Sequence, residues 1–442
     1  MIDARVIYTW IELVVKLATF IIITPLILTN LSAQEAAYFF LINTVVTLGF
    51  LAEGGVNRVI LRLLRYYQSG VVDSTIKYKI KDKETKKDEE DKKIKYIKKL
   101  EIGSLYLYLI LGLISTILIG LVGYPLLFNT IQMQPNTYEA NFAFIALGVY
   151  ILIRILNMRL VAFIHGYNGV VSQKRIEINL GLVKILLMVI SLINQQGVLY
   201  LVLIMLFIEI IHSYFYMKKY SSYRVGGNIE KIHKEYMLDI LKPSYRQSAI
   251  SLSGFIIYQT APLVVAQGDD PVLIASFVLT YQIFQFLKMI SISPVNAIYP
   301  QVVSSLAERN RKKYINLIIK IYKYSIPIYI TGTLAIIFIG DLALQSINST
   351  TTLLPLEYIS LISLMYLLEV NHVIHSSMYM ATNHIPFVIP SILSAVSIIV
   401  LSILFMPIYG FASLIYVQLF AQGAYNNWYP VFINLKLIKS LD

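Results

Sequence analysis

Apolar residues fall into long, nearly uninterrupted blocks, and most polar residues lie in the segments between them. Most blocks are roughly 18 to 27 residues long, and a helix of that length crosses about 30 Å of hydrocarbon. The pattern predicts an all-α integral membrane protein with about twelve transmembrane helices. The predicted spans are Val6–Leu28, Ala36–Leu61, Ile102–Phe128, Asn141–His165, Ile176–Ile193, Val198–Met217, Ser248–Ala266, Val272–Val303, Ile315–Ile339, Leu356–Tyr379, Ile385–Phe405 and Phe411–Ile433.

The composition supports a membrane location. Only 14% of the 442 residues are charged and 57% are hydrophobic, whereas soluble proteins carry about 25% charged residues. The first block contains Glu12 and Lys16 and is followed by no small-residue cleavage site, so we expect a retained helix rather than a signal peptide. The chain has no cysteine, which excludes disulfides, thiolate metal sites and cysteine nucleophiles.

The net charge of +12 is distributed unevenly among the connections between spans. Of the 37 Lys and Arg residues, 32 lie at the termini or in the connections after even-numbered spans, and the connections after odd-numbered spans contain none. Basic residues that flank transmembrane helices stay in the cytoplasm. The sequence therefore predicts that both termini are cytoplasmic, and this placement of the positive charge indicates no nucleic-acid partner.

A basic connection near the middle of the chain divides the twelve spans into two halves of six. We predict an N-terminal bundle over residues 1–217, a cytoplasmic linker over 218–247 and a C-terminal bundle over 248–442. The second span of each half ends in a Val-Asn pair, Val56-Asn57 and Val295-Asn296, followed by an amphipathic exit. Because six spans return the chain to the same side, both bundles would have the same orientation.

The N-terminal bundle contains a charged cytoplasmic loop, residues 66–100. Its Lys77–Lys99 stretch mixes lysines with acids, which is typical of a solvated segment. An alternative role is contact with anionic lipid, since lysines near a membrane surface are each attracted by about 1 kcal/mol. The interspersed acids weaken this alternative.

Four cations within the spans have no acid three or four residues away on the same helix: Arg58, Arg154, Lys184 and Lys288. A charge at the centre of a bilayer costs about 2.5 to 3.5 kcal/mol, so each needs a partner or water. One interpretation is that they reach an interface or pair with acids on other helices. The other is that they line a water-filled central cavity that binds an anionic substrate such as a diphosphate.

Three acids within the spans also have two interpretations. Glu53, Glu209 and Glu369 are candidates for binding a coupling proton or Na⁺, or they are counter-ions of the four cations. We find no HExxH spacing, no Ser-His-Asp arrangement and no glycine-rich phosphate loop. The sequence therefore predicts no catalytic residues, no metal site and no cofactor.

Three stretches carry a family resemblance: GFLAEGGVNRVILRLLRYY at the end of the second span, YQIFQFLKMISISPVNAIYPQVVSSLAERNRKKY around the end of the eighth, and PIYGFASLIYVQLFAQ, which joins the eleventh and twelfth. With the span layout, they make the chain similar to the polysaccharide-transporter branch of the multidrug/oligosaccharidyl-lipid/polysaccharide exporter superfamily. Within that branch the chain resembles the Wzx-type O-antigen flippases. The long mixed-charge loop departs from the usual short connection.

The resemblance implies two six-helix bundles around a central cavity, in a non-enzymatic protein of the cytoplasmic (inner) membrane. It implies that an undecaprenyl-diphosphate-linked oligosaccharide repeat unit is moved to the outer leaflet for O-antigen or capsule synthesis, by alternating access coupled to a cation gradient. Intramembrane cations line the lumen in that family, which agrees with the interpretation of Arg154, Lys184 and Lys288. Other membrane proteins of polysaccharide assembly are the implied protein partners.

Two other classes compete with a flippase. A multidrug or cation antiporter of the same superfamily would favour acids over lysines in its cavity, because its usual substrates are cationic. A membrane enzyme of the same pathway, such as a polymerase, would need a large basic outer loop, whereas every predicted outer connection here is short and free of Lys and Arg. A scaffold for other membrane enzymes stays open.

The predicted topology can be tested with single cysteines, since the chain has none of its own. In intact cells an impermeant thiol reagent should label cysteines placed at Asn136, Asp269 and Asn348. Cysteines at Glu90 and Lys231 should react only after the membrane is permeabilised. Labelling at position 90 without labelling at 269 would overturn the model.

Overall fold

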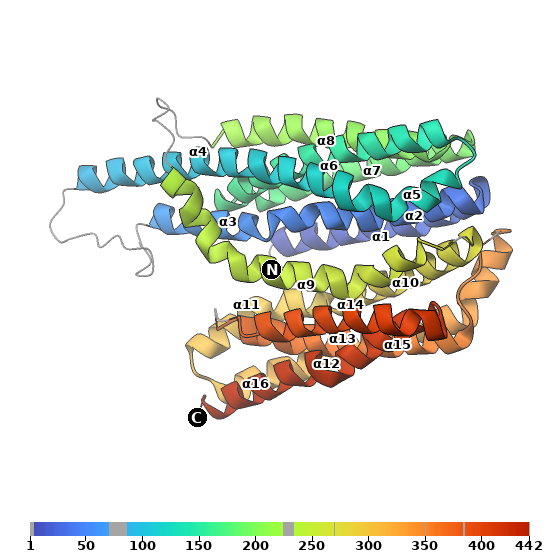
Figure 1. Ribbon diagram of the computed structural model, residues 1–442. Helices are drawn as coiled ribbons and strands as arrows, with labels where there is room; N and C mark the ends of the chain where they lie inside the picture. Colours follow the sequence, from blue (N-terminus) through green and yellow to red (C-terminus); the bar gives the residue numbers. More distant parts are fainter. Residues whose placement is uncertain are drawn as a thin grey trace. The chain divides into compact units, whose positions relative to one another are not determined.

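The computed structural model describes residues 4–69, 86–223, 234–268, 270–349, 351–382 and 385–441, and its regular elements within these ranges are helices (Figure 1). In chain order they are α1 (Ala4–Asn30), α2 (Ala33–Phe50), η1 (Leu51–Glu53), α3 (Val56–Ser69), α4 (Lys86–Leu118), η2 (Ile119–Gly123), α5 (Tyr124–Gln132), α6 (Thr137–Gly166), α7 (Val170–Ile193), α8 (Val198–Ser221), α9 (Lys234–Val265), α10 (Pro271–Ser291), α11 (Ser293–Ala307), α12 (Arg311–Ser346), α13 (Leu356–Met380), α14 (Val388–Tyr409), α15 (Ala412–Ala421), η3 (Gln422–Asn426) and α16 (Trp428–Lys439). The predicted all-α fold is confirmed.

Eleven helical stretches of the described chain are long and apolar enough to cross a membrane. The twelfth predicted span, Phe411–Ile433, is also helical, but it is divided into α15, η3 and α16. The central piece, η3, is a π-helical turn, a local widening that often occurs at functional sites. The prediction of a multi-pass protein with about twelve spans therefore agrees with the structure.

The second predicted span, Ala36–Leu61, is two helices rather than one. The helix α2 and the short turn η1 end at Gly54 and Gly55, whose φ angles are +54° and +79°. Residues with a side chain rarely adopt these angles. In addition, a Cβ atom on Gly54 would lie 2.1 Å from Oγ of Ser248. Glycine at position 54 therefore permits both the break in the helix and the close approach of α9.

The eighth predicted span, Val272–Val303, is interrupted in the same way. The helix α10 ends at Ser291 and α11 begins at Ser293, with Pro294 in its first turn. Proline is favoured there because a backbone N–H in the first turn has no acceptor within the helix, so its absence in proline costs no hydrogen bond. In both halves of the chain the break therefore directly precedes the Val-Asn pair found in the sequence.

Glu53 joins the break between α2 and α3 to a neighbouring helix. Its carboxylate is buried and accepts hydrogen bonds from the backbone N–H groups of Gly55 at 2.9 Å and Asn57 at 2.5 Å. The hydroxyl of Tyr108 on α4 donates to the same carboxylate at 2.7 Å. Glu53 therefore caps the first turn of α3, a position at which a negative charge is stabilised.

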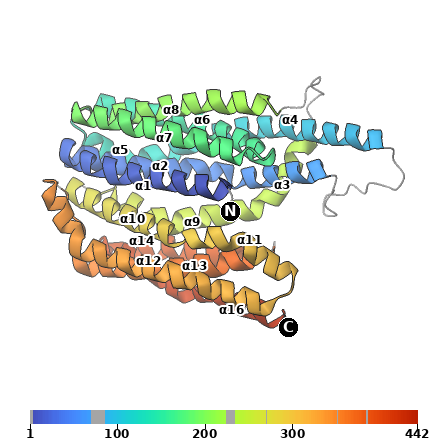
Figure 2. The ribbon, with the colours of Figure 1, turned by 180° about the vertical axis from the view of Figure 1, so that it is seen from behind.

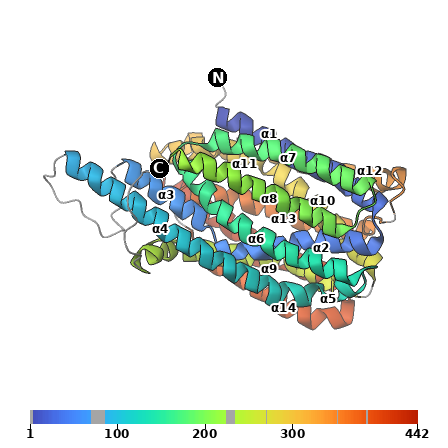
Figure 3. The same ribbon diagram turned by 90° about the horizontal axis from the view of Figure 1, so that it is seen from above.

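Contacts along the chain divide it into two compact units. The first unit comprises residues 1–24, 45–125 and 136–251, and the second comprises 25–44, 126–135 and 252–442. In the first unit α6 packs against α3, α4 and α8, and Figure 3 shows α6, α7 and α8 side by side. A small apolar core forms there around Leu160, Ile164 and Tyr216.

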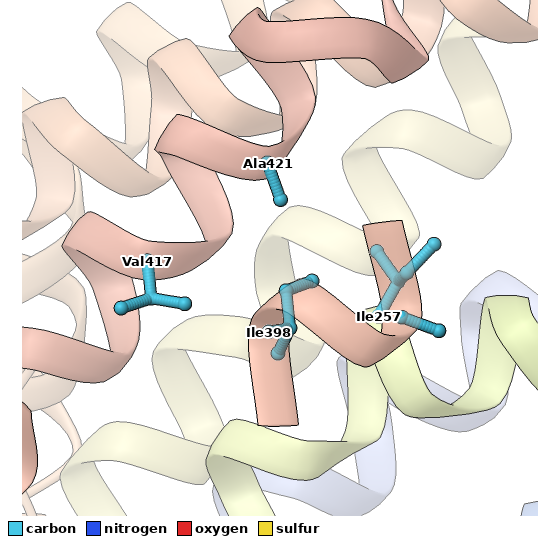
Figure 4. Close-up of a cluster of buried hydrophobic side chains, with 5 residues drawn as sticks. Ile257, Ile398, Val417 and Ala421 are labelled. Atoms are coloured by element: carbon cyan, nitrogen blue, oxygen red, sulfur yellow. The ribbon is translucent and has the colours of Figure 1, made fainter. Parts of the chain in front are cut away.

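In the second unit α13 is the central helix. It packs against α10, α12, α15 and α16, and Figure 2 shows it beside α12. A separate cluster joins α9, α14 and α15 through Ile257, Ile398, Val417 and Ala421, whose side chains meet in Figure 4. Each unit thus has an apolar core of its own.

The charged loop predicted at 66–100 is partly helical. Residues 70–85 lie outside the described ranges, whereas Lys86–Lys99 forms the first turns of α4, continuous with the transmembrane part of that helix. The predicted linker 218–247 is also mostly helix, since α8 runs to Ser221 and α9 begins at Lys234. Its residues 224–233 lie outside the described ranges, as does Asp269.

We predict that Tyr108→Phe destabilises the protein, because Glu53 would lose its hydroxyl donor while it stays buried. Loss of a hydrogen bond to a buried charged group costs about 2 kcal/mol. Thermal unfolding of the purified protein in detergent should show a lower midpoint. Tyr106→Phe is the matched control, because Tyr106 lies on the same helix with an exposed side chain. Equal midpoints for the two variants would contradict the assigned role of Tyr108.

Candidate functional site

The first unit contains a cavity of about 140 Å³ between α1, α6, α7 and α8. Seven ionisable groups other than tyrosine line it: the acids Glu12, Glu177 and Glu209, the bases Lys16, Arg154 and Lys184, and His212. Water occupies about 30 Å³ per molecule in the liquid. The cavity is therefore large enough for several waters, and its polar lining offers them hydrogen-bond partners.

Arg154 on α6 is shared between two acids on neighbouring helices. Its Nη1 atom lies 3.3 and 3.2 Å from the two carboxylate oxygens of Glu209 on α8 and 3.6 Å from Glu177 on α7. In the described part of the chain its Nε and Nη2 atoms make no hydrogen bond. The structure therefore pairs Arg154 with acids on other helices and leaves two guanidinium nitrogens available.

Further donors hold both acids. The side-chain amide of Asn157 donates to Oε1 of Glu209 at 2.6 Å. The hydroxyl of Tyr216 donates to Oε1 of Glu177 at 2.6 Å, and Gln173 donates to the same oxygen at 3.1 Å. Glu177 was absent from the predicted site. It follows Lys174 and Arg175 at the very start of a predicted span, so the sequence places it at the cytoplasmic end of the helix and not within the membrane.

The third acid of the cavity, Glu12, is neutralised twice. Its two carboxylate oxygens lie 2.8 Å from Nζ of Lys16 and 2.5 Å from Nζ of Lys174. By contrast, within the described ranges no carboxylate oxygen lies within 4.0 Å of Nζ of Lys184. Lys184 is therefore the cation of this cavity that has no ion-pair partner there.

The formal charges of the cavity nearly balance. Three acids face three bases across its surface when His212 is neutral. Lys174, which binds Glu12 from outside the lining, adds one positive charge. The excess of positive charge predicted from the unpaired cations is thus a single charge in this cluster. Arg154 with Glu177 and Glu209 carries a net charge of −1, and Glu12 with Lys16 and Lys174 carries +1. Lys184, which has no ion-pair partner in the described chain, adds the remaining positive charge.

A second charged group lies in the second unit. Nζ of Lys288 on α10 is 3.8 Å from the carboxylate of Glu369 on α13 and 4.3 Å from the ring centre of Tyr258. The same carboxylate accepts a hydrogen bond at 3.2 Å from Gln422, the first residue of the π-helical turn η3. A cation close to a ring face is stabilised by the ring quadrupole, so Lys288 has two kinds of partner.

The structure separates the remaining predicted residues from the cavity. Arg58 is exposed on α3, and Glu53 caps that helix. Among the described residues, no group of three or more His, Asp or Glu side chains is placed to hold a metal ion. His372 contacts the carbonyl oxygen of Asn426 at 2.6 Å, and His375 contacts the amide of Asn434 at 3.0 Å.

No protein-family model and no curated protein sequence matches the chain. Solved structures of transporters resemble it over almost the whole length. An inward-facing multidrug resistance MATE family transporter of the MOP superfamily has a TM-score of 0.71 at 15% sequence identity, covering 96% of this chain and 94% of that protein. The lipid II flippase MurJ in an inward closed conformation has a TM-score of 0.63 at 15% identity, covering 99% and 89%.

A MOP superfamily transporter from Pyrococcus furiosus, described as having a binding pocket of reverse polarity, gives a TM-score of 0.58 at 13% identity, covering 99% of this chain and 95% of that protein. The three similar proteins thus differ in what they are described to carry or bind, while their fold is shared. The chain therefore has the fold of the MOP superfamily transporters.

Proposed function

We propose that the protein is a flippase that moves a polyprenyl-diphosphate-linked oligosaccharide across the cytoplasmic membrane. The observation that carries the proposal is the state of the charges in the first unit. All three acids of the cavity are bound to cations, whereas Lys184 has no ion-pair partner in the described chain. The cavity therefore offers one cation without a carboxylate partner, and each of its acids has a cation beside it.

The available donors suit a diphosphate. A guanidinium carries five N–H donors in a fixed plane and binds phosphate oxygens in pairs. Arg154 uses only Nη1 for its two acids, so Nε and Nη2 are open to a ligand. Lys184 adds a compact charge on the next helix, α7. Together they support recognition of an anionic head group inside the bilayer.

The size of the cavity decides which part of the substrate enters it. Sites for small organic ligands usually measure about 300 to 1,000 Å³, and this cavity measures about 140 Å³. It has room for a phosphoryl group with a few waters and none for a chain of sugars. We therefore assign the cavity to the charged head group, and the polyprenyl tail to the surrounding lipid.

The three acids proposed to couple transport to an ion gradient have unequal surroundings. Glu53 accepts three short hydrogen bonds and serves as a helix cap. Glu209 is bound to Arg154 and Asn157. Glu369 has an amide donor at 3.2 Å and a lysine at the longer distance of 3.8 Å. We propose Glu369 as the coupling residue, since the fewest strong contacts oppose its protonation.

A multidrug antiporter is the second candidate function. The first observation that favours it is that the TM-scores of two multidrug MATE transporters, 0.71 and 0.66, are higher than the 0.63 of MurJ. In addition, the formal charge lining the cavity is zero rather than strongly positive. Export of cationic drugs would require an acid that becomes free, and Glu369 is the best placed for that role.

The flippase proposal predicts different outcomes for two substitutions in one cavity. Lys184→Gln should lower transport about tenfold or more and leave protein abundance unchanged, because Lys184 has no carboxylate partner. Arg154→Gln should lower both, since it leaves Glu209 and Glu177 buried without their cation, at a cost of about 3 to 5 kcal/mol. Abundance and surface polysaccharide should be measured together in a strain that depends on this chain.

Lys218→Gln is the matched control, because Lys218 is an exposed lysine of the last turn of α8. It should change neither abundance nor polysaccharide. Normal polysaccharide with Lys184→Gln at normal abundance would refute the assignment of the free charge to substrate binding.

The two candidate functions can be separated in liposomes that contain only this protein. We expect a fluorescent polyprenyl-diphosphate-linked oligosaccharide to move between leaflets and a cationic dye to stay in its compartment. Protein carrying Lys184→Gln should move the labelled lipid about tenfold more slowly. Dye movement that depends on an ion gradient, without movement of the labelled lipid, would favour the multidrug antiporter instead.

A further inference from the structure

His212 is a buried side chain of the cavity that the proposed function does not use. Its ring lies parallel to that of Tyr216, with 5.5 Å between the ring centres and 13° between the planes. Within the described ranges neither of its two ring nitrogens has a hydrogen-bond partner. Buried polar atoms nearly always have a hydrogen-bond partner, so the two ring nitrogens of His212 are an exception that needs an explanation.

Each ring nitrogen lies near a carboxylate, outside hydrogen-bonding geometry. Nδ1 lies 3.4 Å from Oε2 of Glu209, and Nε2 lies 3.9 Å from Oε2 of Glu177. These are the two acids that share Nη1 of Arg154, and Oε2 of Glu209 lies near both Arg154 and His212. The titratable and charged groups around the cavity are Glu12 and Lys16 on α1, Tyr150 and Arg154 on α6, Glu177 and Lys184 on α7, and Glu209 and Tyr216 on α8.

A neutral imidazole fits poorly between two carboxylates. It carries one N–H donor and one lone pair, so one of its nitrogens must present a lone pair to a negatively charged oxygen. An imidazolium carries a positive charge and an N–H group on each nitrogen, so it is attracted to both nearby carboxylates. The geometry around His212 is therefore complementary to its protonated form.

We propose that His212 is a proton-binding site that controls the anion site of the same cavity. A hydronium ion donates a proton to the free ring nitrogen: its O–H bond breaks as the N–H bond forms, and a water molecule is left. The imidazolium then serves as counter-ion to Glu209 and Glu177, and Nη1 of Arg154 is released to join Nε and Nη2 in binding a diphosphate. This role rests on the proposed function, since it assumes an anionic substrate.

Proton and anion strengthen each other's binding in this arrangement. If a proton on His212 raises the affinity for diphosphate by some factor, diphosphate raises the affinity for the proton by the same factor. The proton accompanies the head group and compensates part of its charge while it lies in the bilayer. Because this proton moves in the same direction as the head group, the ion gradient that drives transport would act at another group. This agrees with the assignment of Glu369 as the coupling residue.

The test uses the purified full chain in detergent with inorganic diphosphate as the probe, titrated by calorimetry at pH 5.5 and pH 7.5. When the pH falls from 7.5 to 5.5, the affinity of the wild-type protein for diphosphate should rise about tenfold more than that of His212→Gln. The comparison with the variant removes the contribution of the probe, whose own phosphate protonation near pH 6 acts in both proteins. His212→Lys carries a permanent charge and should bind tightly at both pH values.

His372→Gln in the second unit is the matched control and should keep the wild-type pH dependence. An unchanged pH dependence in His212→Gln would overturn the proposal. So would a His212→Lys protein that is folded and binds like His212→Gln.

A second measurement follows His212 in the wild-type protein itself and uses the His212→Gln variant only to assign its resonance. In wild-type protein with ¹⁵N-labelled histidine, the resonance that is missing from the His212→Gln spectrum should change from the neutral to the charged form between pH 8 and pH 5. At a fixed pH in this range, diphosphate should increase the charged fraction. A ring that stays neutral at pH 5 would refute the proton site.

The two proposals fail in different ways. If wild-type protein binds no diphosphate at either pH, the proposed substrate class is wrong, and the resonance of His212 alone decides whether it is a proton site. If diphosphate binds but leaves the charged fraction of His212 unchanged, the proposed function stands and the link between the two sites is wrong.

Discussion

A charge within a lipid bilayer needs an opposite charge or water close by, and the interior of the first unit is organised by that requirement. Arg154 meets it by reaching two acids on two other helices, and those acids are held in turn by Asn157 and Tyr216. The helices α6, α7 and α8 are thus joined by electrostatics as well as by packing. A network of this kind fixes the register of the helices, because no other alignment brings all of its members within contact distance.

The membrane spans could be predicted because their signal is local. A block of apolar residues and the basic residues beside it are both visible within a short window of sequence. The breaks after Glu53 and after Ser291 were missed, since the hydropathy of the two spans continues through them. Their local cues were present as Gly54-Gly55 and Ser293-Pro294, but in a membrane helix such residues are also common without a break.

The partners of the intramembrane charges could not be predicted, because they lie on other helices. Arg154 and Lys288 had no acid three or four residues away on their own helix, and the structure supplies Glu209, Glu177 and Glu369 from others. No spacing in the sequence relates these residues. The pair of Glu12 and Lys16 could be predicted, since a spacing of four residues along one helix brings the two side chains together.

The breaks that precede the two Val-Asn pairs have a mechanical meaning. A continuous helix resists bending all along its length, because every turn is tied to the next by hydrogen bonds. Where the ladder is interrupted, that stiffness is lost at one point, and at the first break the hydrogen bonds of Glu53 to α3 and α4 hold the helices instead. The second span of each half therefore consists of two helices, and the break between them directly precedes the Val-Asn pair in both halves.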